Sequence, residues 1–412
     1  MSSATYRSLV RAPGAAAFFL TAAVGRVGMA MTSLGIVWLV HARTGSYATA
    51  GLVTGGFAVA EAVAGPQLAR LADRFGQTRM LPPVLLAHAV AVATLLALVA
   101  GGAPDWLLVA GGALAGATIP QLGALSAARW AALLRDGRAA VLPAAFALES
   151  LANELSYLVG PVLVSVIGGS GYPAAATMLA AVLVVAGGLC FAVQRRTAPS
   201  APEASGPHRG GGSLLRPGFV VLAGVNLAIG GFFGAMQISV TAFAVAHGAA
   251  GIAAVLFTVS GCASLLAGWL YGLRHPRIAP RVQLAVATAG LAIGCLSLLA
   301  AGSVVGLGAG IALCGLAIPP ILIVCSVLAE ASVDRAVLTQ AFVWLNSASA
   351  AGSAGTAAAA GWALDALGAH GGFAVAAIAT SVAAALTVTG LRALPAPQRQ
   401  AAAAPVRHGN HG

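Results

Sequence analysis

The chain has 412 residues, of which 59% are hydrophobic and only 8% are charged. Because an ordinary soluble domain has about 25% charged residues, this composition excludes a soluble globular protein and indicates a membrane protein. The formal net charge is +11, but the positive residues form no stripe with interleaved aromatic residues, so nucleic acid is not an expected partner.

Twelve apolar segments follow one another along the chain in two groups of six, and each is long enough for a helix to cross the bilayer. The sequence predicts them near residues 14–41, 48–69, 82–101, 106–127, 140–168, 173–193, 217–246, 251–272, 282–301, 304–328, 337–366 and 371–391.

The groups are separated by a stretch rich in Pro, Gly and Ser, which is typical of a flexible linker. We expect an N-terminal six-helix bundle over residues 1–194, a cytoplasmic linker over 195–216, a C-terminal six-helix bundle over 217–392 and a disordered cytoplasmic tail over 393–412.

The arginines indicate the orientation of these segments. With the N-terminus inside, 19 of the 21 arginines fall in segments on the inner side. Positively charged residues concentrate on the cytoplasmic side of membrane proteins, so we expect a multi-pass protein of the cell membrane with both termini in the cytoplasm.

The two groups of segments resemble each other in sequence. GATIPQ at 116–121 matches GLAIPP at 315–320, and ARLADRFGQTR from Ala69 aligns with GWLYGLRHPRI from Gly268, both at an offset of 199 residues. Six helices in each half give both halves the same orientation. The match therefore predicts a parallel repeat about a pseudo-two-fold axis along the membrane normal.

Charge gathers in one short stretch, LARLADRFGQTRM, between the second and third segments. With the six-plus-six plan, this stretch resembles the loop between helices 2 and 3 of the major facilitator superfamily, which reads roughly Gly-x-Leu-Ala-Asp-Arg-x-Gly-Arg-Lys. Leu71, Ala72, Asp73, Arg74 and Gly76 match it. The resemblance implies an all-α membrane protein with twelve helices, a secondary transporter similar to the drug or solute efflux branch.

The resemblance also implies a gate at the cytoplasmic face. Asp73 is expected against the N-terminal end of helix 11, near Thr339, where the helix dipole favours an anion. We expect Arg74 and Arg79 to pair with acids of neighbouring loops, namely Asp136, Glu330 or Asp334. The alternative is a solvated loop that follows the positive-inside rule. The gating candidates are Asp73, Arg74, Gly76 and Arg79.

Four ionisable residues lie inside the predicted spans, where they are costly and suggest function. Arg26 needs an anionic partner, and Glu154 is the preferred one, which leaves Glu61 or Glu149 to titrate. The alternative is a structural ion pair. The coupling candidates are Arg26, Glu61, Glu149 and Glu154.

The resemblance implies a central cavity lined by helices 1, 4, 7 and 10. Polar residues on these helices are few, so the cavity is expected to be mostly apolar. Each aromatic candidate has an alternative interpretation as ordinary packing or as a lipid-facing residue. The cavity candidates are Trp38, Asn153, Tyr157, Asn226, Phe232, Phe233, Met236 and Gln237.

No residues have the spacing of a metal site, a nucleotide-binding loop or a nucleophile with its base, so neither an enzyme nor a cofactor is expected. We expect a monomeric antiporter in the lipid bilayer that exports small apolar or amphipathic molecules in exchange for protons. The alternatives are a solute importer or facilitator, and a membrane sensor or scaffold without transport activity.

Overall fold

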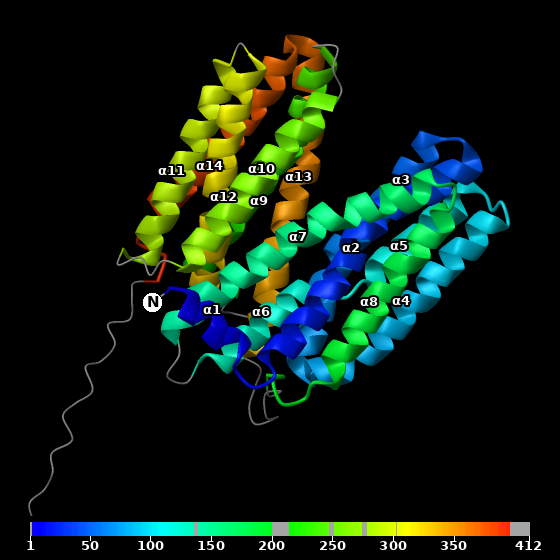
Figure 1. Cartoon of the computed structure of the whole chain (residues 1–412), viewed down its shortest axis with the longest axis horizontal. Coiled ribbons are helices and arrows are strands. Elements are labelled where there is room, and N and C mark those ends of the chain that lie inside the picture. Colours follow the sequence, from blue (N-terminus) through cyan, green and yellow to red (C-terminus); the bar gives the residue numbers. More distant parts are fainter. Residues whose placement is uncertain are drawn as a thin grey trace, which may run out of the picture.

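The computed structural model describes residues 2–135, 139–199, 214–246, 251–273, 278–301 and 303–395. Within these residues the chain is helical and forms no strand (Figure 1). Eleven of the described helical segments are long and apolar enough to cross a membrane. The twelfth, α13 (Leu338–Leu367), is as long but contains many Ala, Gly and Ser residues. The predicted fold of twelve helices in two six-helix halves is confirmed.

The first half contains a short N-terminal helix and six spans. The helices are α1 (Ser2–Val10), α2 (Ala15–Thr44), α3 (Tyr47–Phe75), α4 (Gln77–Ala100), α5 (Asp105–Thr118), α6 (Leu122–Leu133), α7 (Leu142–Gly169) and α8 (Pro173–Val193).

The second half contains six spans. The helices are α9 (Pro217–Ala246), α10 (Gly251–Leu273), α11 (Pro280–Leu299), α12 (Val304–Ser332), α13 and α14 (Ala369–Gly390). Residues 200–213 of the expected linker and 396–412 of the expected tail lie outside the described residues.

The two halves pack their helices in the same way. In the first half α2 contacts α7 and α8, and α3 contacts α5; in the second half α9 contacts α13 and α14, and α10 contacts α12. The α9–α13 contact is close because Gly230 and Gly234 face the carbonyls of Ser349 and Ser353, where a Cβ would not fit. Small residues of this kind let helices approach within a membrane.

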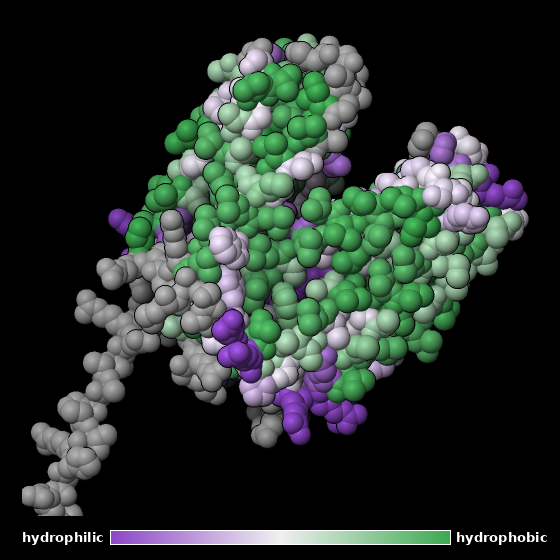
Figure 2. Space-filling view, in the orientation of Figure 1, coloured by the Kyte–Doolittle hydropathy of each residue, from purple (hydrophilic) through white to green (hydrophobic). Residues whose placement is uncertain are grey.

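The halves meet at one end of the molecule and diverge at the other (Figure 1). At the closed end α3 contacts α13, and α7 contacts α10 and α12. Figure 2 shows hydrophobic side chains over the flanks of both bundles and a hollow between the bundles at the open end, with hydrophilic residues within it. The two bundles are therefore in contact at one end and open to the outside at the other.

Two features of the first half differ from the predictions. The fourth span is broken between α5 and α6, at residues 119–121, because Pro120 cannot donate a backbone hydrogen bond. The charged stretch around Asp73 is not a loop: α3 continues to Phe75, α4 begins at Gln77, and only Gly76 separates them. The charged residues therefore lie on helix ends, in positions fixed by the helices.

Candidate functional site

Asp73, in the last turn of α3, makes a polar contact between the two halves. Its carboxylate oxygens accept hydrogen bonds from the backbone N–H groups of Thr339 (3.3 Å) and Gln340 (2.9 Å), in the first turn of α13. The first N–H groups of a helix have no partner within the helix, and the helix dipole there favours an anion. Asp73 thus holds α13 of the other half at the closed end, in the position expected for it.

Gly76 makes the sharp corner that places Asp73. Its backbone has φ 85° and ψ 144°, a conformation that L side chains rarely adopt, and its N–H donates to the carbonyl of Ala72 at 2.9 Å. Because the corner is one residue long, α3 ends where Asp73 can reach α13.

The other two gating candidates make no ion pair among the described residues. Arg74 and Arg79 are exposed, and the guanidinium of Arg74 lies 5.1 Å from the ring centre of its neighbour Phe75. Their predicted pairing with Glu330 or Asp334 is wrong, because those acids face other arginines.

The acids of the closed end have the following positions. The carboxylate of Asp334 accepts from Arg216 at 3.1 Å, and Glu330 lies within electrostatic range of Arg135 and Arg335. Asp136 lies outside the described residues. These acids therefore face arginines of the loops and of the segment before α9, and not the arginines of α3 and α4.

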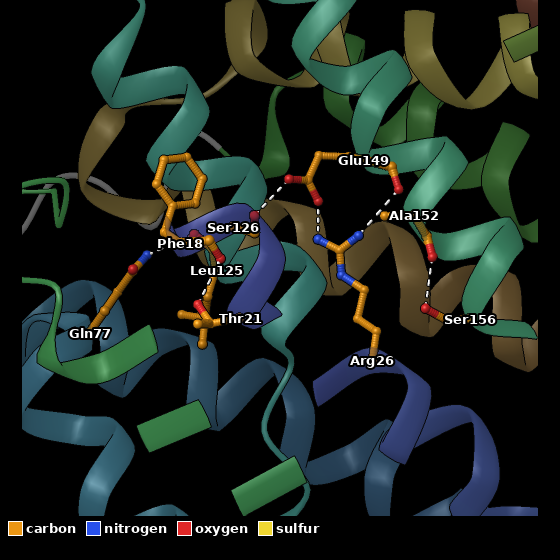
Figure 3. A network of polar contacts seen from close by, with 9 residues as sticks. All are labelled: Phe18, Thr21, Arg26, Gln77, Leu125, Ser126, Glu149, Ala152 and Ser156. Atoms are coloured by element: carbon orange, nitrogen blue, oxygen red, sulfur yellow. Dashed lines mark hydrogen bonds and ion pairs between the residues drawn. The ribbon is translucent and has the colours of Figure 1, made fainter. Parts of the chain in front are cut away.

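Arg26 of α2 pairs with Glu149 of α7 (Figure 3). Its guanidinium donates to the Glu149 carboxylate and also to the Glu149 backbone carbonyl at 3.2 Å, and the second carboxylate oxygen accepts from Ser126 of α6 at 2.6 Å. Both members of the pair are buried. This triad joins three helices of the first half.

The preference for Glu154 as the partner of Arg26 is wrong, for a geometric reason. Side chains on a helix tilt towards its N-terminus. Since α2 and α7 both begin at the closed end, the long Arg26 side chain reaches towards that end, where Glu149 lies. Glu154 lies five residues, about one and a half turns, further along α7.

Glu61 meets the break in the fourth span. Its carboxylate accepts from the side-chain amide of Gln121 at 3.0 Å, and Gln121 is the residue that precedes α6. Glu61 and Glu154 both lie within electrostatic range of the Tyr157 phenol. No ion pair to either acid is found among the described residues, in contrast to the pairing of Glu149.

A cavity of about 180 Å³ lies between Glu154 and the second half. Four of the eight predicted cavity residues line it, all from α9: Phe232, Phe233, Met236 and Gln237. The other lining residues, which the sequence reasoning did not select as cavity residues, are Glu154, Val240, Phe257, Ser260, Gly261, Ser264, Ile311, Cys314 and Ile318.

The other four cavity candidates lie elsewhere. Trp38 packs on α7, where its ring faces Gly168, and Asn226 is buried and donates to the Leu222 carbonyl of its own helix at 2.9 Å. Asn153 and Tyr157 are exposed on α7 beside Glu154 and do not line the described cavity. Trp38 and Asn226 therefore make packing contacts and do not line this cavity.

Arg129 of α6 is a buried cation that the sequence reasoning placed in a loop. Its guanidinium lies 3.6 Å from the ring centre of Phe191 and donates to the Gln77 side chain (2.8 Å), the Gln194 carbonyl (3.0 Å) and the Thr197 hydroxyl (3.2 Å). Gln77 in turn donates to α6, so Arg129 fixes the first turn of α4 next to Gly76. Apolar residues stand on both sides of Arg129 in the sequence, and this pattern indicates a buried position.

Comparisons with known proteins show the family and the fold. A family profile, Major Facilitator Superfamily, matches residues 18–305. No curated protein matches the chain significantly in sequence.

Several solved structures of transporters have the same fold. The human organic anion transporter MFSD10 (TETRAN) is 17% identical with a TM-score of 0.67, covering 92% of this chain and 99% of its own. FucP, a transporter of the same superfamily solved in the outward conformation, is 16% identical with a TM-score of 0.69, covering 90% and 97%. A bacterial homologue of the iron transporter ferroportin in an outward-facing state is 12% identical with a TM-score of 0.72, covering 91% and 98%.

Proposed function

Because the chain belongs to the Major Facilitator Superfamily, we propose that it is a proton-coupled secondary transporter that exports small apolar or amphipathic molecules by alternating access. The family and the transporter neighbours favour transport over catalysis. The observation that carries the proposal is the cavity where Glu154 of the first half faces Phe232 and Phe233 of the second half. An apolar surface with one carboxylate suits an amphipathic molecule better than a sugar, whose hydroxyl groups would remain unpaired.

Alternating access is supported by the contacts at the closed end. The hydrogen bonds from Thr339 and Gln340 to Asp73 join the halves only while this end is closed, so they favour one conformation of the cycle. With both termini in the cytoplasm, as the arginines predict, the closed end is the cytoplasmic one and the described state faces outwards. We assign the protein to the cell membrane, as a monomer.

Proton coupling is supported by the two acids without a cation. Glu149 is neutralised by Arg26, which makes that pair a structural unit, whereas Glu61 and Glu154 face only polar or apolar neighbours among the described residues. A carboxyl group near a cavity without a counter-ion can take up and release a proton during the cycle. We therefore assign coupling to Glu61 and Glu154, and gating to Asp73 and Gly76.

Flux through the purified protein in proteoliposomes tests this function. Vesicles loaded with a panel of labelled amphipathic compounds are placed in a proton gradient of either sign. We expect net movement of at least one compound against the proton flow and none in vesicles without protein. Movement together with protons would indicate an importer, flux indifferent to the gradient would indicate a facilitator, and no flux would favour a sensor or scaffold.

A further inference from the structure

The cavity has a distinctive combination of charge and aromatic rings. Glu154 is the only acid among its described lining residues, and they include no arginine, lysine or histidine. The rings of Phe232 and Phe233 meet edge to face, with centroids 5.4 Å apart, and Phe257 of α10 completes an aromatic wall. The cavity therefore presents one carboxyl group beside three rings whose faces carry partial negative charge.

The charges around the cavity do not compensate Glu154. The arginine that sequence reasoning assigned to Glu154 is held by Glu149 instead. A second acid, Glu61, lies within electrostatic range of Tyr157, as Glu154 does. An anion would be repelled here, whereas a cation would gain both the carboxylate and the ring faces.

We propose that this cavity binds a small organic cation, with its charge against Glu154 and its apolar part on Phe232, Phe233 and Phe257. This inference rests on the proposed transport function and adds the charge of the substrate to it. The ligand chemistry is that of a quaternary or protonated amine attached to an aromatic or aliphatic group.

Binding of three small aromatic probes to the purified full chain in detergent tests the proposal. The probes are phenyltrimethylammonium, the neutral N,N-dimethylbenzamide and the anionic benzenesulfonate, each measured by equilibrium dialysis against protein-free micelles. We expect the cation to bind about tenfold more tightly than either other probe, as expected for a desolvated cation at a carboxylate and ring faces. Equal binding of the three probes, or binding of none, would overturn the proposal.

Two substitutions of Glu154 test whether this residue causes the preference for the cationic probe. Glu154→Gln should remove the preference for the cation, whereas Glu154→Asp should keep part of it. Asn153→Ala, on the same helix but outside the cavity lining, is the matched control and should bind like the unchanged protein. A cation preference that survives in Glu154→Gln would contradict the assignment. Binding without gradient-driven flux would contradict the proposed function alone, and flux without charge preference would contradict this inference alone.

A second, independent observation concerns the short helix α1, which precedes the first span. It contacts α2 and α7 of its own half and α10 of the other half. Leu9 is buried in the core, and the Tyr6 hydroxyl donates to the Trp269 carbonyl of α10 at 3.2 Å. An N-terminal segment thus crosses the junction of the halves at the closed end.

The Tyr6 side chain lies beside residues of both halves. Its ring lies against Gly272 of α10, where a Cβ would collide with both the Tyr6 phenol and the side chain of Ala147 on α7. Burial raises the pKa of Tyr6 from its ordinary value of about 10 to about 12, so the hydroxyl remains a hydrogen-bond donor into the alkaline range. If the halves separate at this end, Tyr6 leaves α10 or α7.

We infer that α1 is a latch, a segment that stabilises the closed end together with Asp73, and that it acts through the contact of Tyr6 with Gly272 of α10. The helix is outside the twelve spans, so its removal leaves both bundles complete. This role does not depend on which molecule is transported.

Solvent labelling at the junction tests the latch. Leu151 of α7 faces Gly268 of α10, so Leu151→Cys reports the opening of this end, and mass spectrometry of the labelled peptide separates it from the native cysteines. Tyr6→Ala and Gly272→Ala should each accelerate labelling about fivefold or more, and the double variant should not add to either single one. Arg7→Ala, on the exposed face of α1, is the control.

Labelling rates are compared only among variants whose unfolding temperature equals that of the unchanged protein. A loss of folded protein therefore cannot account for faster labelling. Unchanged labelling in Tyr6→Ala, or fully additive effects in the double variant, would overturn the latch.

Discussion

The two halves have the same helix packing but different chemistry. The first half holds ionisable residues deep within its spans: Arg26, Glu61, Glu149 and Glu154. In the second half, the charged residues of the helices lie near their ends, as Arg281, Glu330 and Asp365 do. The second half instead supplies most of the aromatic and apolar lining of the cavity.

Under the proposed function, this difference divides the tasks of a duplicated fold between its two halves. A bundle of six helices needs no buried charge for packing, as the second half demonstrates. The charges retained in the first half therefore call for a role of their own. The Arg26–Glu149 pair holds three helices together, and Glu61 and Glu154 remain available for protons or for a positively charged substrate.

The largest effect is expected from breaking the buried pair of the first half. Arg26→Met or Glu149→Leu alone should destabilise the protein by about 3–5 kcal/mol, because each leaves an uncompensated buried charge. The double variant Arg26→Met/Glu149→Leu should recover most of this loss. Thermal unfolding of the purified variants measures it, and single variants as stable as the unchanged protein would contradict a structural role for the pair.

The next effect concerns the contact that joins the halves. Asp73→Asn should favour opening of the closed end by about 1–3 kcal/mol, because the charge at the first turn of α13 is lost. Arg74→Ala should have a much smaller effect, since Arg74 makes no ion pair among the described residues. Labelling of Leu151→Cys measures both variants, and equal effects would show that the two residues act as one unit.

An effect of similar size is expected at the corner between α3 and α4. Gly76→Ala should destabilise the first half by about 1–3 kcal/mol, because φ 85° with ψ 144° is a conformation that alanine rarely adopts. Gly290→Ala in α11 of the second half is the matched control, with open space around the added methyl group, and should be neutral or slightly stabilising. Unfolding midpoints compare the two, and a neutral Gly76→Ala would remove the conformational requirement.

The smallest effect is the pH dependence of Tyr6. Its pKa is raised to about 12 from an ordinary value of about 10. The stabilisation is therefore fully present below about pH 10 and is lost as the pH rises from about 10 to 12. The difference in unfolding temperature between the unchanged protein and Tyr6→Phe should shift against the unchanged protein from pH 8 to pH 11. A constant difference would show that the phenol is not sequestered.

The sequence predicted those features that depend on local pattern. Apolar length fixed the spans closely: the sixth was expected at 173–193, and α8 has the same bounds. The position of Asp73 at the start of α13 was implied by the resemblance of its short motif to that of the family.

Features that depend on packing between distant segments were not predictable in the same way. The choice of Glu149 over Glu154 depends on the direction in which a long side chain leans, and not on its depth alone. Phe232 and Asn226 both belong to α9, yet one lines the cavity and the other is buried beside its own backbone. The contact of Tyr6 with α10 joins residues more than 260 positions apart, and no local pattern indicates it.

The most direct test of the division of tasks compares two transport modes in the same proteoliposomes. Exchange of labelled for unlabelled phenyltrimethylammonium needs cavity contacts but no net proton movement, whereas uptake driven by a proton gradient needs both. Glu61→Gln should keep exchange and lose gradient-driven uptake, and Phe233→Ala should lower both to a similar extent. If Glu61→Gln responds to the gradient as the unchanged protein does, or if Phe233→Ala leaves exchange intact, the assignment of proton coupling to Glu61 and of aromatic substrate contacts to the second half is wrong.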